Sequence, residues 1–157
     1  MSLDKPLLHF ETDFGLSWSR RTNSFISSIL LSSIHGLESY LCGVVFSKTL
    51  NQDARSPWKL GGRTSVDNYF HNLPSLIDES FSLKLSNNSL WAENKKFYNE
   101  IRNPLSHGYE IDDHTEQYRI VDLFEHLSEL YKWIDGWYDL DADISQVKGI
   151  VGFLIRE

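Results

Sequence analysis

Residues 25–46 read FISSILLSSIHGLESYLCGVVF, and this stretch decides the fold class. Large apolar side chains recur in it at steps of three and four residues, which places them on one face of an α-helix. A membrane-spanning helix here would bury Glu38, His35 and five serines in lipid. An acidic residue alone costs about 2.5–3.5 kcal/mol at the centre of a bilayer. We therefore expect no membrane span, and predict a core helix of a soluble bundle over roughly residues 22–46.

The next part of the chain predicts a loop and a second helix. Residues 48–63 are rich in turn formers and predict a connection without regular structure. Thr64 is expected to cap the second helix, whose apolar face begins at Val66. Pro74 lacks the backbone N–H that a helix interior needs, so it is expected to kink or split this helix.

Two further helices follow, and the chain ends are ambiguous. Ser89 is expected to cap a third helix, and a fourth is predicted over roughly residues 115–138. Residues 144–156 predict either a fifth helix or a strand, and residues 7–14 either a short strand or an extended arm. The whole chain, residues 1–157, is thus predicted to be one all-α domain, an antiparallel bundle of four to five helices.

Composition limits the classes of function. Cys42 is the single cysteine, so a disulfide framework within the chain is excluded and a cytoplasmic protein is expected. The net charge is −7, and residues 110–143 hold eleven acidic residues against two basic ones. A protein that coats nucleic acid is expected to be basic. No metal site is expected, because the histidines lack ligand spacing and one cysteine cannot build a structural zinc site. No cofactor is expected either.

Residues 98–110 read YNEIRNPLSHGYE and carry the densest set of reactive side chains. At 100° per residue, five polar side chains share one side of this helix and four apolar ones the other. Pro104 is expected to bend or restart the helix, with Asn103 as the N-cap of the restarted turn and Gly108 as the C′ residue. This bend is expected to turn Arg102 and His107 toward a common point.

This stretch resembles the signature of the HEPN superfamily, in which four to six residues, the first usually polar, separate an arginine from a histidine. Arg102, Asn103 and His107 fit that spacing, and Tyr109 matches the His-x-Tyr extension of HEPN toxins that pair with nucleotidyltransferase antitoxins. The resemblance covers about eight residues and implies a HEPN-like all-α fold and metal-independent cleavage of RNA in a toxin–antitoxin or phage-defence setting.

The implied chemistry suits these residue types. A histidine titrates near neutral pH, so His107 can take a proton from the ribose 2′-OH or give one to the leaving oxygen. Arg102 can hold phosphate oxygens as charge develops, and Asn103 can orient the histidine or a phosphate oxygen. The resemblance also implies a homodimer in which two such sites meet, and a Tyr109 that an antitoxin modifies with adenylate.

A structural interpretation of the same residues is the alternative. Arg102 would then pair with Glu100 or with an acid of the fourth helix, His107 would face the helix C-terminus, and Tyr109 would pack over the helix end. The chain would in that case be a non-catalytic interaction or ligand-binding module. Outside this stretch, His126 is predicted to face solvent and Cys42 to be an inert core thiol.

Overall fold

A computed structural model describes residues 16–108 and 120–137, with side chains from residue 25 onward and, after the gap, from residue 121. Within these ranges the regular structure is helical throughout, which confirms the all-α class. Tyr109, the predicted arm over residues 7–14 and the helix-or-strand question over residues 144–156 lie outside the described residues.

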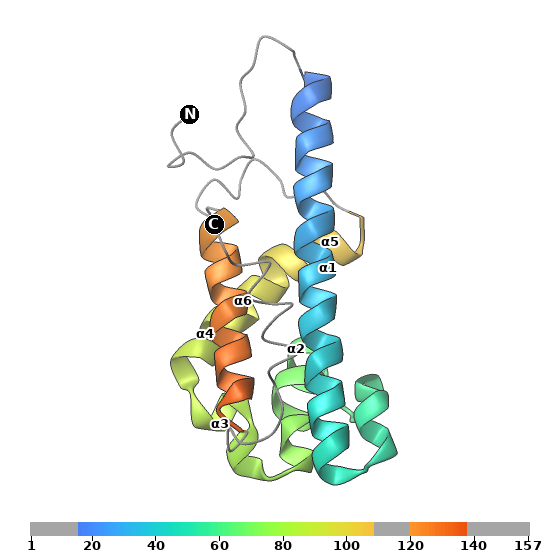
Figure 1. Cartoon of the computed structure of the whole chain (residues 1–157), viewed down its shortest axis with the longest axis vertical. Coiled ribbons are helices and arrows are strands. Elements are labelled where there is room, and N and C mark those ends of the chain that lie inside the picture. Colours follow the sequence, from blue (N-terminus) through green and yellow to red (C-terminus); the bar gives the residue numbers. More distant parts are fainter. Residues whose placement is uncertain (1–15, 109–119, 138–157) are drawn as a thin grey trace.

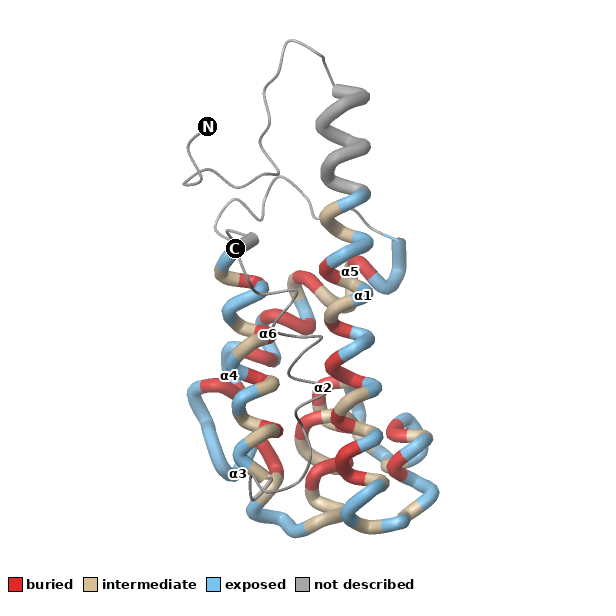
Figure 2. The backbone as a smooth tube through the Cα atoms, in the orientation of Figure 1, coloured by how far each residue is buried: buried red, intermediate tan, exposed pale blue. Residues whose placement is uncertain are grey.

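Helix α1 (Leu16–Thr49) is longer at both ends than the apolar pattern predicts. From residue 25 onward, residues on one face of it are buried and residues on the opposite face are exposed (Figure 2). Phe25–Thr49 is long and apolar enough, by those two measures alone, to cross a membrane, a test that the core helix of a soluble protein also passes. The helix ends at Leu50, which adopts a φ of 53° and whose N–H still bonds to Phe46 O at 2.7 Å.

Three long segments lie side by side (Figure 1). Helix α4 (Asn88–Phe97) continues through a π-helical turn η6 (Tyr98–Arg102) into α5 (Asn103–Ser106), and this segment runs antiparallel to α1. Helix α6 (Ile120–Asp135) also runs antiparallel to α4, so α1 and α6 point in the same direction.

Short helical turns replace the predicted loop and second helix. Thr64 caps this region as predicted, because its hydroxyl accepts a hydrogen bond from Asp67 N at 3.2 Å. Pro74 splits the region as predicted. The turns are η1 (Gln52–Arg55), η2 (Pro57–Lys59), α2 (Ser65–Asp67), η3 (Asn68–Asn72), η4 (Pro74–Leu76), η5 (Glu79–Phe81) and α3 (Leu83–Ser86).

A π-helical turn precedes both Pro74 and Pro104. Leu73 N bonds to Asn68 O at 2.9 Å before Pro74, and Asn103 N bonds to Tyr98 O before Pro104. A proline ring crowds the carbonyl four residues earlier, and the wider turn relieves that crowding. The backbone therefore stays helical through Pro104.

Asn103 is not the N-cap that the sequence predicts. Its backbone is α-helical, with φ −67° and ψ −47°, and its side chain caps nothing. The helix continues from the π-turn into α5 without a break, so there is no new N-terminus for Asn103 to cap. Gly108, in contrast, is the predicted C′ residue: its φ is +77° and its N–H bonds to Leu105 O at 3.1 Å.

The core lies where α1, α4, α6 and the η3 turn meet (Figure 2). The apolar side of residues 97–105 is buried, as the helical wheel predicts. The largest fully buried side chains are Tyr98, Phe70, Leu30, Ile34, Leu37, Leu41, Leu73, Leu83, Ile101, Leu130, Ile134 and Val45.

His126 is half-buried, so the prediction that it faces solvent is wrong. Its ring lies against the ring of Phe97, with 4.8 Å between centroids, and its Nε2 is 3.1 Å from Asn94 Oδ1. Burial lowers the pKa of His126 from 6.5 to about 4, because a charged imidazolium would lose its hydration there.

Asn87, rather than Ser89, caps α4, and the stabilities of variants at the two positions test this assignment. The Asn87 Oδ1 accepts from Leu90 N at 3.0 Å, so Asn87→Ala leaves a helix N–H without its partner. We expect a loss of about 1 kcal/mol in the free energy of unfolding for Asn87→Ala. Ser89→Ala is the matched control and should change it by less than about 0.5 kcal/mol. Urea titrations measure both, and an equal loss in the two variants would contradict the assignment of the cap.

The lowered pKa of His126 predicts a loss of stability in mild acid. Below pH 6.5 the unfolded chain binds a proton at His126 that the folded chain excludes until about pH 4. The free energy of unfolding should therefore fall by about 2 kcal/mol more between pH 7 and pH 5 in the wild type than in His126→Gln. Identical slopes in the two proteins would contradict a buried neutral His126.

Candidate functional site

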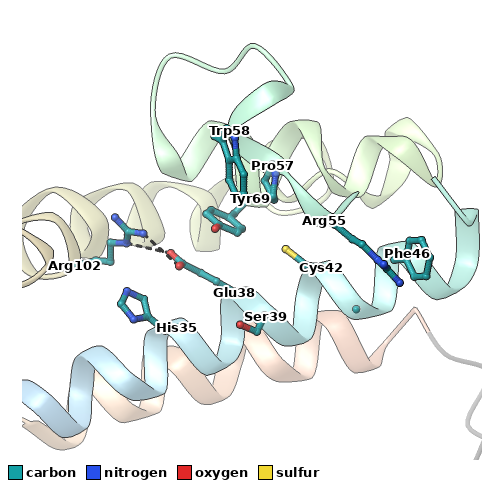
Figure 3. Close-up of a pocket in the computed structure, with 11 residues that line it drawn as sticks. His35, Glu38, Ser39, Cys42, Phe46, Arg55, Pro57, Trp58, Tyr69 and Arg102 are labelled. Carbon is teal, nitrogen blue, oxygen red and sulfur yellow. Dashed lines mark hydrogen bonds and ion pairs between the residues drawn. The ribbon is translucent and has the colours of Figure 1, made fainter. Parts of the chain in front are cut away.

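A buried glutamate forms the centre of the candidate site. Glu38 lies on the apolar face of α1 and is only 5% exposed. Arg102 donates to both of its oxygens, from Nε to Oε1 at 3.1 Å and from Nη2 to Oε2 at 3.3 Å (Figure 3). Tyr98 donates its hydroxyl to Oε1 at 2.8 Å. This two-point, charge-assisted pairing fixes the plane of the Arg102 guanidinium.

The π-turn supplies both partners of Glu38. Tyr98 opens the turn and Arg102 closes it, so both side chains reach α1 from the same segment. The Arg102 guanidinium also lies 5.5 Å from the centre of the Tyr98 ring. Asn103 Oδ1 accepts from Arg102 Nη1 at 3.4 Å. Among the described residues these bonds use three of the five N–H groups of an arginine, which leaves two donors for a ligand.

His107 occupies a different position from Arg102. It is the C-cap residue of α5, and its side chain is exposed. Arg102 lines a pocket beside α1, whereas His107 is not among the residues that line it. It stays a prediction that Arg102 and His107 contact the same phosphate. It also stays a prediction that a second copy of the chain completes the site in a dimer.

The pocket has a volume of about 660 Å³ and lies between α1 and the turns that follow it (Figure 3). Side chains of α1 spaced by three and four residues form one wall, and residues of η1, η2, η3 and η6 form the others. The lining residues are His35, Glu38, Ser39, Cys42, Gly43, Phe46, Arg55, Pro57, Trp58, Tyr69 and Arg102.

The thiol and the phenol in this pocket stay protonated at neutral pH. Burial, followed by the nearby Glu38 carboxylate, raises the pKa of Cys42 to about 11 and that of Tyr69 to about 12. The same two causes raise the pKa of Tyr98 well above its usual value. Cys42 is therefore a thiol rather than a thiolate at neutral pH, and it lines the pocket and is only partly buried instead of lying in the core. In the described residues no three His, Cys, Asp or Glu side chains gather as metal ligands.

The structure assigns Arg102 a partner that the sequence analysis missed. The alternative interpretation paired Arg102 with Glu100 or with an acid of the fourth helix, but its ion pair is with Glu38 of α1. The available signal was one acidic residue within the apolar stripe between Ile34 and Leu41. A carboxylate in that position requires a buried donor.

No protein-family model, curated protein or solved structure matches the chain. The likeness to the HEPN signature therefore depends on residues 102–109 alone.

Removal of Arg102 should destabilise the protein, because it leaves a buried carboxylate without a cation. We expect Arg102→Met to lower the free energy of unfolding by roughly 3 kcal/mol. His107→Ala, at an exposed position, should lower it by less than about 0.5 kcal/mol. The double variant Glu38→Met/Arg102→Met should recover much of the loss, since an apolar pair can replace a buried ion pair. Urea titrations measure all three, and an Arg102→Met variant as stable as the wild type would contradict the buried pair.

Proposed function

We propose that this chain is a HEPN-type, metal-independent endoribonuclease. Arg102 holds the scissile phosphate, His107 transfers a proton and Asn103 assists by fixing Arg102. The observation that carries the proposal is the orientation of Arg102: Glu38 and Asn103 hold the guanidinium at a pocket wall with two N–H donors left over. A donor group fixed before substrate arrives needs no reorganisation as charge develops on phosphate.

The reaction follows from these groups. A base removes the proton of a ribose 2′-OH, the 2′-oxygen attacks the neighbouring phosphorus, and the bond to the 5′-oxygen breaks. The leaving 5′-oxygen takes up a proton, and the products are a 2′,3′-cyclic phosphate and a 5′-hydroxyl. One histidine cannot act as base and acid at once, so the proposal includes a homodimer that presents two copies of His107.

The biological setting of the proposal is a cytoplasmic toxin or phage-defence effector. A nucleotidyltransferase-type antitoxin would modify Tyr109, which is two residues from His107 in the sequence. An adenylate there adds negative charge and bulk next to the proton-transferring group, and it would repel an RNA phosphate. Both the partner and the modification depend on the resemblance of residues 102–109.

The second candidate is a non-catalytic ligand-binding module, and the ion pair favours it. The charge of Arg102 is compensated by a carboxylate that is 3.1 Å from Nε. The pair also joins α1 to η6, which is a structural task sufficient to explain Arg102. In this case the pocket binds a ligand and His107 has no chemical role.

Cleavage of RNA by the wild type and by His107→Ala separates the two candidates. We expect purified wild type to cleave mixed RNA in EDTA at pH 7, and His107→Ala to be at least about 100-fold slower, because proton transfer contributes that much. Labelled RNA on a denaturing gel measures the rate. His107 is the informative position because its side chain is exposed, whereas loss of activity in an Arg102 variant would also follow from unfolding.

Ser106→Ala is the matched control, since Ser106 is also exposed and lies on the same turn. It should cleave at the wild-type rate. A wild type that leaves RNA intact at high protein concentration, or a His107→Ala variant that cleaves as fast as wild type, would favour the ligand-binding module. A monomer in sedimentation would contradict the dimeric site.

A further inference from the structure

We propose that the pocket beside α1 binds a nucleoside 5′-monophosphate, with the base against Trp58 and the phosphate on Arg55. This inference concerns binding; it uses the same pocket as the ribonuclease proposal, but no step assigned to Arg102 or His107 enters it. It is carried by four features of the described residues: an open wall on α1, an unpaired cation, an exposed aromatic ring and the size of the pocket.

The wall on α1 is open because of the residues that form it. Ser39 and Gly43 are small, and they alternate with larger side chains along one stripe of the helix. A Cβ atom built on Gly43 meets no heavy atom within 4 Å, so the space beside this residue is free. A large side chain at position 43 would therefore project into open space without strain in the helix.

Arg55 is the cation that the pocket offers to an anion. Its guanidinium lies 4.0 Å from the centre of the Phe46 ring, which holds it by a cation–π contact. The described residues give Arg55 no carboxylate partner, although the chain carries a net charge of −7. The other pocket arginine, Arg102, is already paired with Glu38. A phosphate that enters the pocket therefore finds the uncompensated positive charge at Arg55.

Trp58 is the aromatic surface of the pocket. Its side chain is 68% exposed, so the ring contributes little to the core. The preceding Pro57 is buried and anchors the η2 turn that presents the ring. Figure 3 shows Trp58 near Tyr69, across the pocket from α1. An exposed indole that lines a pocket is a stacking surface for a planar base.

Size and chemistry together select the ligand. A volume of about 660 Å³ is in the range of small-molecule sites, which extends over roughly 300–1,000 Å³. Free phosphate would leave the aromatic and apolar walls unused, and a purely apolar ligand would bury the Arg55 charge without a partner. A nucleoside monophosphate supplies a planar ring and one compact anion, and a pocket of this volume can hold both.

Calorimetric titration tests the proposal with AMP, adenosine and ribose 5-phosphate as probes, on the His107→Ala protein. AMP contains no internucleotide bond, so binding is measured without cleavage. We expect AMP to bind at least about tenfold more tightly than either fragment, because each fragment lacks one of the two contacts. Trp58→Ala should weaken AMP binding about tenfold or more. Arg55→Gln should reduce the affinity for AMP to that for adenosine, and Gly43→Leu should abolish binding by filling the pocket.

The matched controls are Arg63→Gln and Leu85→Ala, which alter an exposed arginine and an exposed apolar residue outside the pocket lining. Both should bind AMP as the parent does, and circular dichroism checks that every variant is folded. Equal affinities for AMP and adenosine, unchanged affinity in Trp58→Ala and Arg55→Gln, or no binding at millimolar AMP would each overturn the proposal. AMP binding by a wild type that cleaves no RNA would leave this inference standing and remove only the ribonuclease.

Discussion

The buried carboxylate of Glu38 is the constraint on which the rest of the structure depends. A charge in the core costs several kcal/mol unless it is paired and hydrogen-bonded, and Glu38 receives hydrogen bonds from Arg102 and Tyr98. Arg102 is 64 residues and Tyr98 is 60 residues away in the sequence, so the interaction ties the first helix to the η6 turn. The same carboxylate helps to keep Cys42 and Tyr69 protonated. This interaction therefore joins α1 to η6 and adds to the burial that raises the pKa of two groups in the pocket.

The two helix-interrupting prolines shape the site as well as the chain. Each follows a π-helical turn, and each turn contributes a residue to the pocket, Tyr69 from η3 and Arg102 from η6. A π-turn inserts one extra residue and so rotates the side chains that follow it relative to an α-helix. Pro74 and Pro104 thus favour the wide π-helical turns that precede them, and Tyr69 and Arg102 reach the pocket from these turns.

Local features were predictable from the sequence, and contacts between distant segments were not. The stripe of α1, the Thr64 cap and the left-handed Gly108 each depend on a few neighbouring residues, and all three are confirmed. The prediction that Ser89 caps α4 was wrong because Asn87, two residues earlier, has an equally good capping side chain. The end of α3 determines which of the two residues begins the helix. The prediction that His126 faces solvent was wrong because its burial depends on Phe97, which belongs to another helix. Around the pocket, Arg102 and its neighbour Asn103 were singled out from the sequence, whereas Arg55 and Trp58 were not, since the turns between α1 and α2 have no period to interpret. Glu38 has a sequence signal, as an acidic residue within an apolar stripe, but its partners are 60 and 64 residues away and follow only from the fold.

The ion pair also restricts how the pocket can treat a phosphate. At 5 Å and an effective dielectric constant of about 20, a unit charge contributes about 3 kcal/mol, so the attraction of Arg102 and the repulsion of Glu38 nearly cancel for an anion close to both. Arg102 can therefore orient a phosphate through the N–H groups that Glu38 and Asn103 do not use, but it adds little net attraction. Arg55 lacks such a carboxylate within the described residues and retains its full attraction. Arg55 and Arg102 lie at opposite ends of the pocket (Figure 3), so Arg55 would attract an anion by its charge, while the donors of Arg102 would orient a polar group at the other end.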